Sequence, residues 1–292
     1  MTILRKFPEW LRKPLPKNNE AIRTAETMDS LRLSTVCRSA KCPNISECYS
    51  RHVATFMIMG DICTRNCAFC GVGKGIPQTL DTNEPVRVAE AAVKLGLKHV
   101  VITSVTRDDV QDGGSGHFAE TIQAVRKLLP DSTIEVLVPD FRGDESSVHT
   151  VLYAKPEIFN HNVETVPRLY PIVRPQGDYR RSLRILKYAK NTSPAIRTKS
   201  GLMLGLGETD NEVVKAMQDL RDAGCDMITM GQYLQPGKGN LSVAEFVSPK
   251  RFAEYERFAY SLGFTSAYCA PFVRSSYHAA EYAASIGIMK QS

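Results

Sequence analysis

Six short apolar runs rich in β-forming residues alternate with stretches of helical periodicity, and this alternation constrains the fold more than any other feature. The expected strands are 53–60, 99–105, 133–140, 156–164, 196–205 and 226–234. The expected helices between and after them are 85–95, 117–129, 144–152, 179–190, 210–223 and 249–261. Strands that alternate with helices form a parallel sheet with right-handed crossovers.

Six such units fit either a doubly wound open sheet or a partial barrel. We expect an α/β protein built as a partial (β/α)6 barrel, because the chemically informative residues follow the carboxyl ends of strands, where barrel active sites lie. On this basis residues 51–264 form the barrel, residues 1–50 an N-terminal extension and residues 265–292 a C-terminal extension.

Three cysteines, Cys63, Cys67 and Cys70, follow the first expected strand within eight residues. Thiolates are the ligands of iron–sulfur clusters. Three ligands leave the fourth iron of a [4Fe–4S] cluster open to a substrate or cofactor. Zinc is the main alternative, but zinc sites usually show two ligand pairs rather than one triplet. The spacing therefore predicts a [4Fe–4S] cluster.

A second triplet, Cys37, Cys42 and Cys48, precedes the first. It needs a fourth ligand from elsewhere, and Cys225, Cys269, or a hydroxyl or histidine near the C-terminus are candidates. Lone cysteines are more often buried as small hydrophobic residues. From spacing alone, a structural zinc site stays open as an alternative for this triplet.

The cysteines are expected to be reduced, because the sequence predicts a cytoplasmic protein. No apolar run approaches the roughly 18 residues of a membrane span, and the first 20 residues hold no apolar signal region. Inside the cell thiols stay reduced. Eight cysteines are therefore better explained by metal binding than by disulfides.

The net charge of +6 is modest, and it predicts no nucleic-acid binding by itself. The basic residues gather in two stretches, which suit an acidic partner or a phosphate, or form a solvated face. The members are Arg5, Lys6, Arg12, Lys13, Lys17 and Arg23, and then Arg168, Arg174, Arg180, Arg181, Arg184, Lys187 and Lys190.

The spacing Cys-x3-Cys-x2-Cys after the first strand resembles the radical S-adenosylmethionine (SAM) superfamily. The N-terminal spacing Cys-x4-Cys-x5-Cys resembles one of its families, the lipoyl synthases. Further segments resemble motifs of that family, over about residues 8 to 279: PEWLR at 8–12, TSVTRDD at 103–109, HNVET at 161–165, GLMLGLGE at 201–208 and VRSSYHA at 273–279.

This resemblance implies roles for individual residues. Cys63, Cys67 and Cys70 would hold a [4Fe–4S] cluster whose open iron binds the amino and carboxylate groups of SAM. Phe69 would lie against the adenine. The residues implied for the methionine and ribose parts are Thr103, Asn162, Glu164, Glu208 and Gln232.

The resemblance also implies that Cys37, Cys42 and Cys48 hold an auxiliary [4Fe–4S] cluster. Its fourth ligand would be a serine of the Arg-Ser-Ser-Tyr motif. We assign this ligand to Ser275, with Ser276 as the second choice.

The implied activity is insertion of two sulfur atoms, at C6 and C8 of a protein-bound octanoyl-lysine. A SAM-derived 5′-deoxyadenosyl radical would abstract the hydrogens, and the auxiliary cluster would supply the sulfur. No side-chain acid or base is implied, because such C–H bonds are not acidic. The implied partners are octanoylated lipoyl-carrier domains, which tend to be acidic, a reductant such as flavodoxin or ferredoxin, and an iron–sulfur carrier for cluster repair.

Two other classes of protein are alternatives to this function. Among other radical SAM enzymes, tRNA methylthiotransferases carry an additional C-terminal RNA-binding domain, and biotin synthase lacks an N-terminal triplet of this spacing. A non-catalytic iron–sulfur or zinc scaffold would need neither six strand–helix units nor an open iron. The sequence thus predicts an enzyme that binds neither nucleic acid nor a membrane.

Overall fold

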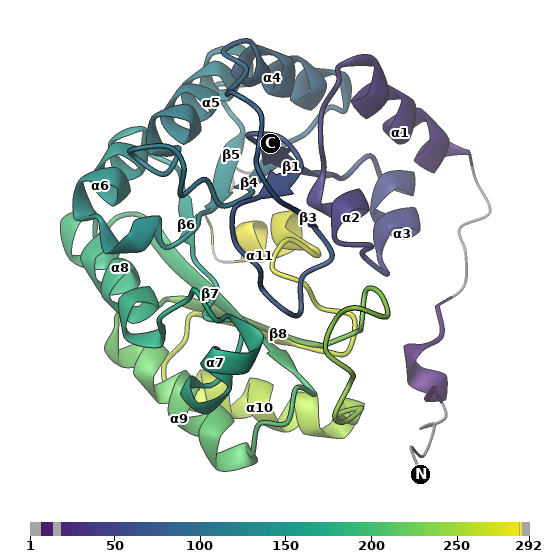
Figure 1. The fold of residues 1–292 in the computed structure, drawn as a ribbon, viewed down its shortest axis with the longest axis vertical. Coiled ribbons are helices and arrows are strands. Elements are labelled where there is room, and N and C mark those ends of the chain that lie inside the picture. Colours follow the sequence, from purple (N-terminus) through teal and green to yellow (C-terminus); the bar gives the residue numbers. More distant parts are fainter. Residues whose placement is uncertain (1–6, 14–18, 286, 288–292) are drawn as a thin grey trace.

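A curved sheet of seven parallel strands forms the centre of the computed structural model, which describes residues 7–13, 19–285 and 287. The strands, in their order across the sheet, are β1 (Thr55–Ile58), β4 (His99–Ser104), β5 (Thr133–Leu137), β6 (Ile158–Asn160), β7 (Arg197–Leu204), β8 (Met227–Gln232) and β9 (Ser266–Cys269). Figure 1 shows the strands arranged in an arc with helices around the outside. The expected α/β partial barrel is therefore confirmed.

The six expected helices form, and each follows one strand of the barrel. They are α4 (Glu84–Lys94), α5 (Ser115–Leu128), α6 (Glu145–Tyr153), α8 (Tyr179–Thr192), α9 (Asp210–Asp222) and α10 (Pro249–Ser261). Short elements η2 (Phe141–Gly143), η3 (Pro167–Leu169) and α7 (Tyr170–Val173) lie in the loops that follow β5 and β6. Apolar residues of the sheet's outer face, such as Ile102, Val136 and Ile228, pack with these helices to form the core.

Local sequence explains where several helices begin. Ser248 caps α10 by accepting from the backbone of Arg251, and Pro249 occupies its first turn. At the start of α9 the structure has a capping box in which Thr209 and Glu212 satisfy each other's backbone amides.

The strand expected at 156–164 is the largest difference in bounds, because β6 ends at Asn160. Residues 161–163 leave the regular strand pairing, and Glu164, which adopts a left-handed φ of 66°, forms an isolated parallel bridge with Leu202 of β7. This conformation is costly for a residue with a side chain and commonly marks a functional site. Glu164 therefore keeps the chain beside β7 after the regular strand has ended.

The N-terminal extension is helical and packs beside the first strand. Its elements are η1 (Glu9–Leu11), α1 (Glu20–Ser30), α2 (Val36–Ser39) and α3 (Ile45–Ser50). The loop after β1 contains a small parallel pair, β2 (Ile62–Cys63) and β3 (Gly73–Lys74). No helix among the described residues is long and apolar enough to cross a membrane.

The segment predicted as a C-terminal extension begins with a seventh strand, since β9 pairs in parallel with β8. The chain then turns into the barrel and forms α11 (Ala279–Ser285). Figure 1 shows α11 inside the ring of strands. Ala283 packs there against Ile158 and Met227, the first residues of β6 and β8, so α11 fills the amino end of the barrel.

Candidate active site

A cavity of about 410 Å³ at the carboxyl ends of the strands is lined by cysteines of both triplets. Cys63, Cys67 and Cys70 line it from the loop after β1, and Cys37 and Cys42 line it from the N-terminal helices. A smaller adjoining cavity of about 20 Å³ is lined by Cys37, Cys42 and Cys48. The location agrees with the expectation that ligands bind at the carboxyl ends of parallel strands.

The first triplet lies in a loop whose backbone is partly fixed by sulfur contacts. The amides of Arg65 and Thr106 donate to the Cys63 sulfur at 3.4 and 3.3 Å. Burial raises the pKa of the Cys70 thiol to about 12, with Cys67 and Cys63 adding to the effect, and burial likewise raises the pKa of Cys67. A bound cation is therefore needed to hold these groups as thiolates at neutral pH.

The second triplet is carried by α2, α3 and the turn between them. Burial raises the pKa of Cys37 to about 11 and that of Cys48 to about 12. No three His, Cys, Asp or Glu side chains of the described residues are grouped so that they could hold one metal ion.

Four of the six residues predicted to contact SAM line the central cavity: Phe69, Thr103, Asn162 and Glu164. Desolvation raises the pKa of the Glu164 carboxyl, although Arg174 opposes the change. The Thr103 hydroxyl already donates to the Leu137 carbonyl at 2.9 Å. These four residues are therefore near enough to serve as contacts.

Glu208 and Gln232 are absent from the cavity wall among the described residues. The Glu208 carboxylate accepts from the backbone amides of Gly205 and Leu206. The Gln232 amide donates to the Leu204 carbonyl and accepts from Val247. Both side chains therefore hold loops at the carboxyl edge, which is the turn and capping role that such residues often have.

Two cavity residues that the sequence did not single out carry buried polar atoms with no partner among the described residues. They are the Ser104 hydroxyl and Nε of Arg174. The other end of Arg174 is held, since Nη1 donates to the Asn162 carbonyl at 2.9 Å. Buried donors are normally paired, so both atoms suit a polar ligand in the cavity. The sequence did not distinguish Arg174 from the other basic residues of its segment.

The two serines of the 273–279 motif face different surroundings. The hydroxyl of Ser275 exchanges hydrogen bonds with the Asn162 side chain at 2.7 and 2.9 Å. Ser276 lines the small cavity with the second cysteine triplet, and Ser275 does not. The remaining candidates, Cys225 and Cys269, are buried in the core and line neither cavity.

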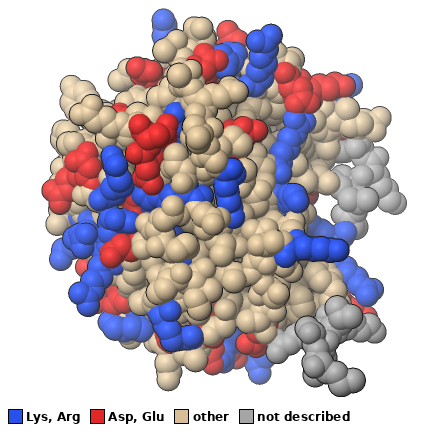
Figure 2. Space-filling model, viewed as in Figure 1, with Lys and Arg blue, Asp and Glu red and all other residues tan. Residues whose placement is uncertain are grey.

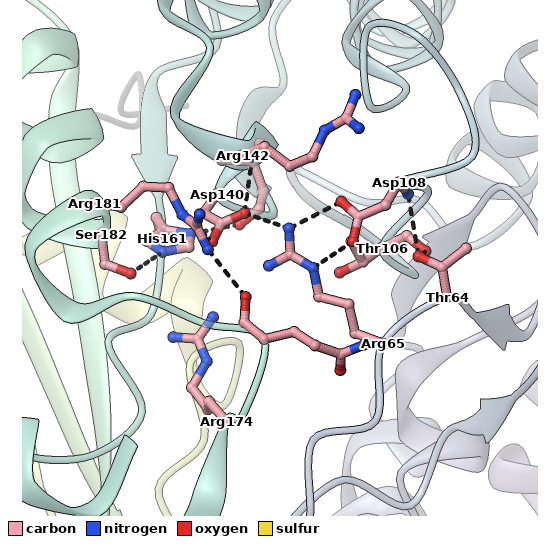
Figure 3. Close-up of polar contacts among 12 residues, drawn as sticks. Thr64, Arg65, Thr106, Asp108, Asp140, Arg142, His161, Arg174, Arg181 and Ser182 are labelled. Atoms are coloured by element: carbon pink, nitrogen blue, oxygen red, sulfur yellow. Dashed lines mark hydrogen bonds and ion pairs between the residues drawn. The ribbon is translucent and has the colours of Figure 1, made fainter. Parts of the chain in front are cut away.

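An alternating chain of carboxylates and guanidinium groups holds the loop of the first triplet (Figure 3). Arg65, between Cys63 and Cys67, donates to Asp108 at 2.6 and 2.9 Å and to Asp140 at 2.7 Å. Asp140 also accepts from Arg181 of α8 at 2.8 Å. The cysteine loop is thereby fixed to the loops after β4 and β5 and to one barrel helix.

His161 lies beside this chain of charged groups and is itself neutral. Its Nδ1 must donate to the Val138 carbonyl at 2.9 Å, so Nε2 accepts from the Ser182 hydroxyl at 2.9 Å. Burial, with the nearby Arg174, lowers the pKa of His161 to about 4. The neutral imidazole therefore acts as a hydrogen-bonding spacer between β6 and α8 near neutral pH.

We expect Asp140→Asn to lower the free energy of unfolding by about 3–5 kcal/mol, because it leaves two arginines with a neutral partner at a buried site. Burial alone would raise the pKa of Asp140, but Arg65 and Arg181 hold it well below its usual range. The stabilisation is thus complete above the unfolded pKa of about 4 and is lost as the pH falls below it.

Denaturant titration between pH 3 and 8 measures this effect. The control is Asp29→Asn, which removes the carboxylate of the exposed pair with Arg38 and should cost under about 1 kcal/mol. Equal losses in the two variants would contradict a special role for the buried chain.

Known proteins agree with this architecture. A model of the radical SAM superfamily matches residues 57–230. Curated proteins named lipoyl synthase include one from Caldanaerobacter subterraneus subsp. tengcongensis, 57% identical over 93% of this chain and 95% of that protein. Another, from Caldicellulosiruptor saccharolyticus, is 52% identical over 94% of this chain and 97% of that protein.

Solved structures with the same fold include methylornithine synthase, with a TM-score of 0.54, 14% identity and coverage of 86% of this chain and 84% of that chain. A maturase of the [FeFe]-hydrogenase aligns with a TM-score of 0.55, 15% identity and coverage of 86% and 67%. Likeness at this identity concerns the fold alone. The superfamily match and the near-full-length relatives together show that the chain belongs to the radical SAM superfamily and, within it, to the lipoyl synthase family.

Proposed function

We propose that this protein is a lipoyl synthase, which inserts sulfur at C6 and C8 of an octanoyl group carried on a lysine of an acceptor protein. The observation that carries the proposal is that all three cysteines of the first triplet and two of the second line one cavity. When bound, the first cluster with SAM supplies a radical able to remove hydrogen from an unactivated carbon, and the auxiliary cluster supplies sulfur.

The protein's own part is to hold, orient and balance charge. Cys63, Cys67 and Cys70 would hold the first cluster. The positive charge of Arg174 favours the thiolate of the adjacent Cys67, and burial lowers the pKa of Arg274 while the neighbouring Cys42 opposes that change. Each triplet thus has a guanidinium beside it, which lowers the cost of placing anionic sulfur in a partly desolvated site.

The cavity wall also suits a fatty acyl chain. Apolar side chains such as Met57, Leu137 and Met203 line the same cavity as cysteines of both triplets. Burial of an eight-carbon chain against such a wall is favourable by about 0.8 kcal/mol for each CH₂ group. The acyl carbons could then lie within the space that both clusters border.

For the fourth ligand of the auxiliary cluster we propose Ser276 rather than our first choice from sequence, Ser275. Ser276 lies with Cys37, Cys42 and Cys48 on the small cavity. The hydroxyl of Ser275 is engaged by Asn162 from both its donor and its acceptor side. The part of the chain that the structure describes places no hydrogen bond on the Ser276 hydroxyl, so this hydroxyl is better placed to bind iron.

The partner we propose is an acidic carrier domain that docks on α8. Arg180, Arg184 and Lys187 are exposed and fall on one face of this helix, at spacings of four and three residues. The described residues place no ion pair on any of the three. Figure 2 shows Lys and Arg side chains gathered over the region of α8, on the left of the view.

Other members of the predicted basic segment already have partners. Arg168 pairs with Glu212 at 2.7 Å, and Lys190 pairs with Asp226 at 2.8 Å. Arg181 is held by Asp140. This leaves the outer face of α8 as the part of the segment that is free to steer an acidic protein.

The first test compares Cys67→Ala with Cys42→Ala after anaerobic reconstitution. Cys67→Ala should abolish formation of 5′-deoxyadenosine from SAM, because the cluster with the open iron is lost. Cys42→Ala should still form 5′-deoxyadenosine but no lipoyl product. The iron content of each variant should be about four per chain, against about eight in the parent. Undiminished radical formation in Cys67→Ala would refute the assignment of the first triplet.

The second test compares the two serines. Ser276→Ala should lose most lipoyl formation and the auxiliary iron while it retains SAM cleavage. Ser275→Ala should keep both clusters, because only a hydrogen bond to Asn162 is removed, at a cost of about 1 kcal/mol in stability. Iron counting and product analysis by mass spectrometry decide between them. The reverse pattern would restore Ser275 as the ligand.

The third test reverses charge on α8. Arg180→Glu/Arg184→Glu/Lys187→Glu should raise KM for an octanoylated carrier protein on the order of tenfold at low salt, because docking loses its electrostatic steering. KM for a short octanoyl-lysine peptide should not change. Lys250→Glu/Arg257→Glu, on the exposed face of α10, is the control. Equal shifts for both sets would exclude α8 as the docking site.

A further inference from the structure

The interior of the barrel contains a polar layer that the catalytic assignment does not use. His99, Glu135, Asn160 and Lys199 come from four successive strands and are all buried. Lys199 is 1% exposed and Glu135 is fully buried. A lysine buried this completely is rare unless it is paired, so its contacts indicate what it does.

Lys199 is shared between a carboxylate and the C-terminal segment. Its Nζ donates to Oε1 of Glu135 at 2.8 Å and to the backbone carbonyl of Ser275 at 2.6 Å. Asn160 donates to the same Glu135 oxygen at 3.1 Å. Burial raises the pKa of Glu135, but the attraction of Lys199 and His99 outweighs it and brings the pKa to about 2. Glu135 is therefore ionised near neutral pH.

Stability alone does not explain such a pair. Replacing a buried ion pair by apolar side chains of similar volume is often neutral or stabilising. What apolar side chains could not supply is the donor that reaches the Ser275 carbonyl. A charged donor makes a shorter and stronger hydrogen bond than a neutral one, and this one comes from a rigid strand.

Other residues of the C-terminal segment 271–276 are also held by close contacts. Its Phe272 carbonyl accepts from the Asn44 side chain at 2.7 Å. A Cβ added at Gly201 of β7 would lie 3.1 Å from the Ser275 hydroxyl, and one added at Gly231 of β8 would collide with the Val273 carbonyl. The two glycines therefore leave the space through which this segment passes.

We propose that Lys199, held in place by Glu135, is the positioning residue that seats the segment 271–276 at the mouth of the barrel. By fixing the Ser275 carbonyl, it sets the direction of the next residue, Ser276, toward Cys37, Cys42 and Cys48. This inference rests on the proposed role of Ser276 for its functional meaning, but the seating itself concerns only protein contacts.

The experiment uses Lys199→Met/Glu135→Gln, which removes both charges, nearly preserves volume and leaves no unpaired charge. In the protein without clusters, amide hydrogen exchange of residues 270–279 should become at least about tenfold faster, because local opening costs less free energy. After reconstitution, iron should fall from about eight to about four per chain, with SAM cleavage retained. A matched variant, Arg126→Met/Glu157→Gln, removes an ion pair that does not contact the segment and should leave this exchange unchanged.

Unchanged exchange at 270–279, or a uniform increase over the whole sheet, would overturn the proposal. The milder Glu135→Gln variant keeps the lysine and should give a smaller increase in the same amides. It therefore decides the question if the double variant does not fold. Because exchange is measured without clusters, full activity of Ser276→Ala would refute the ligand assignment while leaving the seating of the segment to be judged on its own result.

Discussion

The constraint on which this structure depends is that thiols from two separate segments must face one cavity. A parallel sheet meets it, because every strand ends at the same edge and the loop after β1 emerges there beside the N-terminal helices. The first triplet needs only that loop. The second needs an extension that packs along β1, which the bridge between Thr35 and Phe56 fixes in place.

Charge balance is the second theme of the site. Arg65, Arg174 and Arg274 approach the cysteine groups, while Asp108 and Asp140 neutralise the first of these arginines. A guanidinium fixed by two carboxylates has little freedom to move, so it holds the loop rather than serving a ligand. Arg174 differs because one of its nitrogens lacks a partner among the described residues. Of the two arginines on the first triplet's side, it is the one available to a ligand.

The sequence was informative wherever local chemistry decides structure. Hydrophobic runs and helical periodicity located the six expected strands and helices, and the spacing of Cys63, Cys67 and Cys70 predicts a common role for them. Residues 156–164 show the limit, since an apolar run does not reveal where the chain leaves the sheet. Glu208 and Gln232 show another, because a polar residue near a strand end can serve a loop as readily as a ligand.

The sequence did not predict contacts between residues that lie far apart along the chain. Arg181 pairs with Asp140 and is therefore not part of the exposed basic surface. No neighbouring residue in the sequence distinguishes Arg181 from Arg180. The same holds for Lys199, whose partner Glu135 lies 64 positions away in the sequence and is brought beside it by the sheet. The choice between Ser275 and Ser276 depends on the path of the backbone, which neighbouring residues in sequence do not determine.

The small cavity that is lined by the second cysteine triplet is closed by residues far apart in the sequence, and this affects the order in which the molecule folds. Asn44 meets the Phe272 carbonyl across 228 positions, and the hydroxyl of Tyr277 meets Glu47 across 230. Contacts of such separation cost chain entropy and form late, after local strand–helix units have assembled. The barrel and the first cysteine loop can therefore become ordered while the second pocket is still open on one side. The surroundings of the first triplet are thus completed before those of the second triplet. The second triplet therefore stays accessible for longer during folding.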